Sequence, residues 1–124
     1  MTTAKGNFEI NMTPQQDDEA PAGRFVLNKT YQGDVEGTAA GQMISKRIED
    51  GAAMYFAVEE FAGSVNGKSG AFTLMHKGFM DKELQSLEVT IMDGSGSGEL
   101  VGISGSLKII QEGGAHAYEL NFAL

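Results

Sequence analysis

The feature that most constrains this chain is the spacing of its glycines between short runs of alternating apolar and polar residues. Seventeen of the 124 residues are glycine and only two are proline. Alternation with a period of two predicts β-strands, and pairs such as Asn66-Gly67 and Gly113-Gly114 predict tight turns. Since no stretch keeps a helical period for three turns, the pattern is typical of an all-β barrel or sandwich.

Eight strands are predicted, at residues 7–12, 24–31, 34–48, 52–65, 68–76, 84–92, 99–110 and 115–124. Every connection is short except the polar, acidic segment from Thr13 to Gly23, which carries both prolines. Short connections favour an antiparallel meander, and eight such strands can close into a barrel without exposed edges. We therefore predict one all-β domain over residues 1–124, an eight-stranded antiparallel up-and-down barrel. Thr13 to Gly23 would be a linker between the first two strands, or a lid.

Composition excludes several classes of site and partner. The chain has no cysteine, so it forms no disulfide, thiolate metal site or cysteine nucleophile. A formal net charge of −8 disfavours nucleic acids and anionic membranes as partners. No apolar run approaches the roughly 18 residues of a membrane span, and the first ten residues lack the apolar core of a secretory signal. We therefore expect a cytoplasmic protein.

Three segments, GSVNGKSGAFTLMHKG, DGSGSGELVGISGSLKI and GGAHAYELNFAL, follow one another in the part of the chain between Gly33 and Leu124. Together they resemble a family of small bacterial proteins known as domain of unknown function 3224. The most specific piece is SGSGELVGISG (Ser95 to Gly105), in which Ser97 replaces the threonine of the usual Ser-Gly-Thr-Gly pattern. The resemblance implies an allene oxide cyclase-like, calycin-like barrel. Such relatives bind apolar small molecules, steer their cyclisation or coupling, and often associate, which implies a homodimer or small homo-oligomer.

The first hairpin allows residues to be assigned to faces. If Asn66-Gly67 is a two-residue turn, Val65 lies opposite Lys68, and counting outward gives every other pair. Opposite residues point to the same side of a sheet. Because it carries most of the large apolar groups of the fifth strand, one face is assigned to the lumen: Tyr55, Glu59, Phe61, Phe72, Leu74 and His76.

The last hairpin is treated in the same way. With Gly113-Gly114 as its turn, His116 lies opposite Gln111. The resulting apolar face would carry His116, Tyr118, Leu120, Leu107 and Ile109, with Glu99, Val101 and Ile103 on the same face of the seventh strand.

Strand direction brings four polar side chains toward one end of the predicted barrel. His76, His116 and Tyr55 would lie near that end, with Glu59 one layer deeper. Histidine titrates near neutral pH, and a carboxylate beside it in an apolar lumen suits proton transfer. A satisfied polar network that fixes strand register explains the same four residues more simply, because buried polar groups are normally hydrogen-bonded.

A metal site is a further alternative, with His76, His116 and Glu59 as zinc or iron ligands, or with Asp93 and Glu99 around a cation. No short-spacing ligand motif supports either one, so no metal and no cofactor are predicted.

The leading functional hypothesis is a barrel that binds an apolar or amphipathic small molecule. Tyr55, Glu59, His76 and His116 would orient its polar group. The apolar contacts would come from Phe61, Phe72, Leu74, Ile109, Tyr118 and Leu120. One alternative is a cyclase- or isomerase-like enzyme that uses the same polar residues. Another is a structural or oligomerisation module with a filled lumen, in which outward residues such as Val26 and Met75 form a subunit interface.

Overall fold

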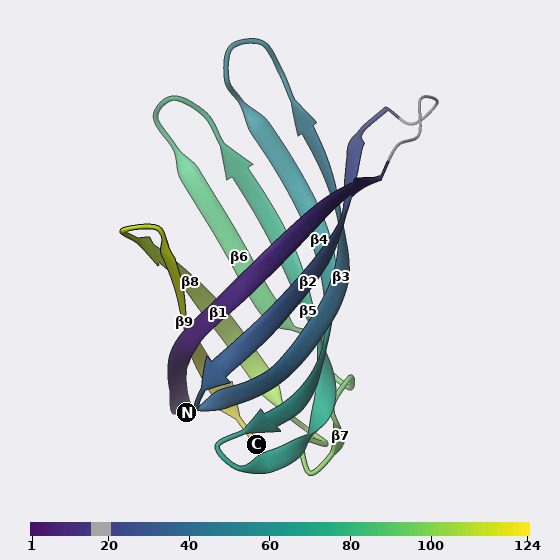
Figure 1. The fold of residues 1–124 in the computed structure, drawn as a ribbon, viewed down its shortest axis with the longest axis vertical. Helices are drawn as coiled ribbons and strands as arrows, with labels where there is room; N and C mark the ends of the chain where they lie inside the picture. Colours follow the sequence, from purple (N-terminus) through teal and green to yellow (C-terminus); the bar gives the residue numbers. More distant parts are fainter. Residues whose placement is uncertain (16–20) are drawn as a thin grey trace.

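In the computed structural model, which describes residues 1–15 and 21–124, the chain forms a closed antiparallel β-barrel (Figure 1). The strands in the described residues are β1 (Thr2–Gln15), β2 (Gly23–Gly33), β3 (Val35–Arg47), β4 (Ala53–Val65), β5 (Lys68–Met80), β6 (Gln85–Ile91), β7 (Ser97–Gly98), β8 (Ser104–Glu112) and β9 (Ala115–Ala123). The same residues contain no helix that is long and apolar enough to cross a membrane.

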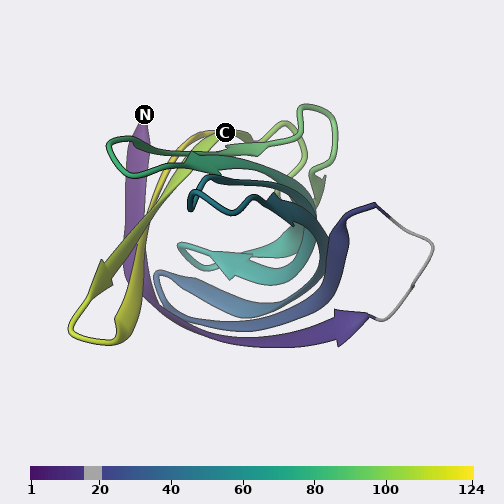
Figure 2. The same cartoon turned by 90° about the horizontal axis from the view of Figure 1, so that it is seen from above.

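The sheet closes on itself in the order of a meander. Neighbouring strands run β4-β3-β2-β1-β9-β8-β6-β5, and an additional pairing of β4 with β5 completes the ring (Figure 2). Every pairing is antiparallel. The two-residue strand β7 pairs with β5 outside this ring. The predicted eight-stranded up-and-down barrel is therefore confirmed, with one short strand added.

Both predicted hairpin registers are confirmed. Asn66 and Gly67 have φ angles of 49° and 84°, the left-handed conformation that a tight hairpin turn requires at both central positions. As a result Glu59 lies opposite Leu74, and Ala57 opposite His76. In the last hairpin, His116 lies opposite Gln111.

The predicted bounds of the linker are wrong at both ends. Thr13, Pro14 and Gln15 continue β1 and pair with β2, and Gly23 already belongs to β2. The pairing of β1 with β2 therefore continues beyond the last residue of the apolar alternation, which is why the sequence pattern places the end of β1 too early. The centre of the predicted linker or lid, residues 16–20, lies outside the described residues.

The segment that precedes β8 is a pair of turns rather than the start of a strand. Leu100 N donates to Ser97 O at 3.0 Å, and Ile103 N donates to Leu100 O at 3.1 Å. These turns break the expected alternation, so Val101 is 68% exposed whereas Leu100 and Ile103 are buried. The assignment of Glu99, Val101 and Ile103 to one strand face is therefore wrong. Leu100 and Ile103 instead join the core cluster. The turns that contain them follow β7, which lies at the lower end of the barrel in Figure 1.

The interior is filled at one end and partly exposed at the other. Side chains of the core cluster fill the end where the chain termini and β7 lie (Figure 1). Toward the hairpin tips, the inward-facing side chains become half-buried: Ile10, Phe25, Met43, Tyr55, Ile109 and His116. The candidate site lies at the boundary between these two regions.

We expect alanine at Gly37 to destabilise the barrel. Gly37 has a φ of +149°, and a Cβ there would lie 2.3 Å from the carbonyl oxygen of Ala62 on β4. The free energy of unfolding in urea should fall by about 2 kcal/mol or more. Gly23→Ala is the matched control, since its Cβ would meet its nearest atom at 3.4 Å. Equal stabilities for the two variants would contradict the conclusion that β3 and β4 approach too closely at Gly37 for a Cβ.

Candidate functional site

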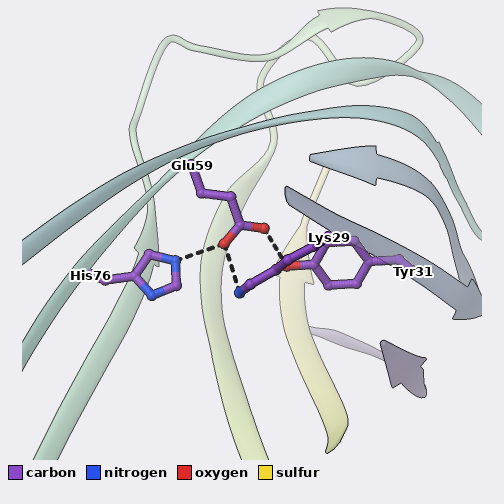
Figure 3. A network of polar contacts seen from close by, with 4 residues as sticks. All are labelled: Lys29, Tyr31, Glu59 and His76. Carbon is purple, nitrogen blue, oxygen red and sulfur yellow. Dashed lines mark hydrogen bonds and ion pairs between the residues drawn. The ribbon is translucent and has the colours of Figure 1, made fainter. Parts of the chain in front are cut away.

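A buried carboxylate, that of Glu59, accepts hydrogen bonds from three side chains inside the barrel (Figure 3). Lys29 Nζ lies 2.9 Å from Glu59 Oε1, and His76 Nε2 lies 2.8 Å from the same oxygen. The Tyr31 hydroxyl donates to Oε2. Glu59 is 1% exposed, and Lys29 and His76 are also buried. The network therefore holds a charge pair in the interior of a small domain.

The network joins three strands. Lys29 and Tyr31 lie two positions apart on the inward face of β2, and Glu59 lies on β4. His76 lies on β5, two residues beyond Leu74, the residue opposite Glu59. Strand β3 separates β2 from β4, and it presents Ala39 opposite Lys29 and Gly41 opposite Glu59. Because these two residues are small, the long side chains of Lys29 and Glu59 can meet across β3.

The hydrogen bonds determine the charge of Glu59. Burial alone raises the pKa of this carboxyl, but the hydrogen bond from His76, the charge of Lys29 and the hydrogen bond from Tyr31 outweigh burial and lower the pKa to about 2. Burial and the neighbouring carboxylate raise the pKa of Tyr31. At neutral pH the site therefore contains an ionised Glu59 and a protonated Tyr31.

Lys29 and His76 differ in what surrounds the atoms that do not contact Glu59. Lys29 Nζ lies 4.8 Å from the centre of the Phe8 ring, a cation–π distance. His76 donates through Nε2, because an ionised carboxylate can only accept. Among the described residues, its other ring nitrogen, Nδ1, has no hydrogen-bond partner. In the neutral imidazole this Nδ1 is a hydrogen-bond acceptor and a base.

The structure brings together two of the four predicted polar residues, Glu59 and His76. His116 instead stacks on Phe8, with ring centres 5.2 Å apart and planes 27° apart. Tyr55 lies across Gly78, one inward position beyond His76 on β5, and burial raises its pKa. His116 and Tyr55 therefore lie on the open side of the network and not within it.

Sequence reasoning missed Lys29 and Tyr31. The signal was the phase of β2, in which Leu27, Lys29 and Tyr31 alternate with the outward Asn28 and Thr30. A lysine in the apolar phase of a strand needs a buried partner, because an unpaired buried charge is costly. Glu59 is the corresponding carboxylate in the inward phase of β4.

Five of the six predicted apolar contacts belong to the packed core: Phe61, Phe72, Leu74, Tyr118 and Leu120. The Tyr118 hydroxyl also accepts from Val35 N at 2.9 Å and donates to Gln32 O or Val35 O at 3.0 Å, so it holds the connection of β2 to β3. Ile109 differs, because it is only partly buried against that core.

Neither predicted metal alternative finds a cluster of ligands. Across residues 1–15 and 21–124, no group of three or more His, Asp or Glu side chains is arranged to hold a metal ion. His116 stacks on Phe8, and Glu99 Oε1 accepts a hydrogen bond from Ser69 N at 3.0 Å.

Comparison with known proteins gives a family and a fold. A family model described as "Protein of unknown function (DUF3224)" matches residues 4–122. The crystal structure of a DUF3224 protein of unknown function from Shewanella oneidensis MR-1 is similar over 99% of this chain and 96% of that chain, with 34% sequence identity and a TM-score of 0.93. No curated protein matches the chain.

The segment that resembles the family most specifically, Ser95 to Gly105, supplies no side chain to the Glu59 network. It contributes Leu100 and Ile103 to the core. Ser95 Oγ accepts from Thr73 N at 3.0 Å and donates to Met92 O at 2.6 Å. These residues therefore close the barrel, and the resemblance they carry is a resemblance of fold.

We expect Glu59→Gln to lower the free energy of unfolding at pH 7 by about 3 kcal/mol, because it leaves the buried Lys29 charge unpaired. The folded-state pKa of Glu59 lies below its unfolded value of 4.5. The stabilisation by the ionised carboxylate is therefore present above about pH 5 and is lost as pH falls toward 2. The free energies of unfolding of wild type and variant should therefore approach each other as the pH falls, and urea unfolding at several pH values measures this.

Glu36→Gln is the matched control, since Glu36 is an exposed glutamate on the neighbouring strand β3. Its effect should stay within about 0.5 kcal/mol. The double variant Lys29→Met/Glu59→Gln should recover part of the loss, because it removes both charges. A pH-independent difference between wild type and Glu59→Gln would refute the ionised carboxylate.

Proposed function

Because this chain belongs to the DUF3224 family of proteins of unknown function, we propose a function from its own geometry: the open end of the barrel binds an apolar or amphipathic small molecule. The observation that carries the proposal is the gradient along the inward face. Buried side chains fill one end, the Glu59 network lies above them, and half-buried apolar side chains follow toward the hairpin tips.

Four inward-facing residues would contact the apolar part of the ligand: Ile10, Phe25, Met43 and Ile109. They come from different strands and are each half-buried in the absence of a ligand. Covering them would remove apolar surface from water, which is the main favourable contribution to binding at such sites. The five core residues named above would be reached only if the core opened, so the proposal does not use them as contacts.

Three polar side chains would orient the ligand. The Tyr55 hydroxyl and the His116 ring lie on the open side. His76, whose Nε2 contacts the Glu59 carboxylate, lies deeper. A ligand hydroxyl or amide donor suits His76 Nδ1, which accepts a hydrogen bond in the neutral ring. A few polar groups within an apolar lining are typical of small-molecule sites.

The seam between β6 and β8 supports access to this end. In the described part of the chain, these two strands share one ladder pair, Thr90 with Ser106. Above it, β6 pairs with β5 and β8 pairs with β9, so the two hairpins diverge toward their tips (Figure 1). Ile109 on β8 and Leu87 on β6, which is 41% exposed, lie along this diverging part.

Native mass spectrometry of protein purified gently from its own host tests the proposal. We expect a discrete added mass of an organic molecule. Met43→Glu, which places a charge on the inward face, should reduce its occupancy about tenfold or more, since a buried unpaired charge is costly. Gln42→Glu on the outward face of the same strand is the control. A clean chain mass would contradict the proposal and favour a structural module with a filled lumen.

A second candidate function is proton transfer in a cyclase- or isomerase-like reaction. The Glu59–His76 contact favours it, because the carboxylate orients the imidazole through Nε2 while Nδ1 faces away from the carboxylate. His76 would be the general base, and Tyr55 or His116 would be the acid. No cofactor enters this proposal.

His76→Gln separates binding from catalysis. A glutamine amide can donate to Glu59 as the imidazole does, but it cannot accept a proton. Turnover of the molecule found by mass spectrometry should fall about 100-fold or more, while the bound mass persists. Unchanged turnover in a folded His76→Gln variant would rule out His76 as the base.

A further inference from the structure

We infer that the outer face of β1 to β5 is a two-fold interface between two copies of this chain. The inference rests on an exposed apolar patch and an adjacent groove whose sizes and charges complement each other. It is independent of ligand binding, because the residues involved point away from the lumen.

The outer apolar patch consists of six large side chains that are each 41–53% exposed: Ile44, Met54, Phe56, Val58, Met75 and Phe79. The strand register makes it continuous. Ile44 lies opposite Phe56, Met54 opposite Phe79, and Val58 opposite Met75. Val26 on β2 extends the row of Val58 through Gln42. Monomeric proteins rarely expose contiguous apolar patches larger than a few hundred Å².

An outer groove of about 520 Å³ lies next to the patch. Along β4 the outward residues continue from Val58 to Glu60 and Ala62, so the groove begins where the patch ends. Its centre is lined by the small residues Thr38, Ala40, Ala62 and Ala71, and its lining includes the carboxylates of Glu9 and Glu60. The groove can therefore receive large side chains. Its exposed charged residues are Glu9 and Glu60, since Lys29, which also lines it, is buried and paired with Glu59.

Two lysines border the patch. Lys77 lies opposite Phe56 on β4 and opposite Glu88 on β6, and Lys46 lies opposite Met54. A two-fold axis that lies in the interface and runs across the strands would place the patch of each copy over the groove of the other. The large apolar residues would then meet small ones, and the lysines would approach Glu9 and Glu60. Such self-complementarity is what a symmetric dimer requires.

A second copy is the occupant that fits best. A stable interface buries roughly 800 Å² per partner, and patch and groove together form one continuous, self-complementary face. The chain carries a net charge of −8, so most approaches of two copies are repulsive. Lysines beside the patch and glutamates in the groove make this pairing an exception.

Sedimentation velocity at micromolar concentrations tests the inference, and we expect a dimer of the wild-type chain. Val58→Glu in the patch and Ala62→Glu in the groove should each weaken the dimerisation Kd about tenfold or more, since central interface residues contribute most of the binding energy. Circular dichroism and urea unfolding check that both variants fold. Ser106→Glu is the control, because Ser106 is exposed on β8, which does not belong to this face.

A wild-type monomer at all concentrations would overturn the inference. A dimer that survives both Val58→Glu and Ala62→Glu would place the interface elsewhere and also overturn it. Loss of the dimer in Val58→Glu but not in Ala62→Glu would show patch-on-patch pairing and overturn the role of the groove. Loss in both variants, with the control still dimeric, is the expected result.

Discussion

The charge of Glu59 inside the barrel is the constraint on which the rest of the interior depends. An ionised carboxylate that is 1% exposed needs donors on every side, and Lys29, Tyr31 and His76 supply them. These donors come from β2 and β5, so the carboxylate ties together three strands that hairpin turns alone would not hold in place. Below the network the lumen is packed, and above it the inward side chains are half-buried.

The two ends of the barrel have different roles. The turns that contain Leu100 and Ile103 close the lower end, and they include the residues by which the chain most resembles its family. The high similarity to the Shewanella oneidensis structure is therefore expected for the scaffold. Chemistry that distinguishes one barrel from another is expected at the open end, because the side chains there are incompletely packed.

Successive residues of each strand point alternately into the barrel and outward, so every strand contributes to both an inner and an outer surface. Glu59 and Glu60 are neighbours in sequence, yet one is paired in the interior and the other lines an outer groove. Val58 and Ala62 face outward beside them, while Ala57 and Phe61 are buried. A ligand site and a dimer face can therefore share β4 without sharing side chains.

The sequence by itself determined the closed eight-stranded barrel, both hairpin registers, and the shared face of Glu59 and His76. It did so because a two-residue turn fixes which residues lie opposite each other in a hairpin. It did not reveal that Lys29 reaches Glu59 across β3, that His116 stacks on Phe8, or that Leu100 rather than Val101 enters the core. Lys29 and Glu59 lie on non-adjacent strands, and Leu100 follows a turn that breaks the alternation. His116 and Phe8 lie on β9 and β1, the last and first strands of the chain, which become neighbours only when the barrel closes. Only closure and bending of the whole sheet decide them, since pairing between neighbours leaves the distance across the lumen open.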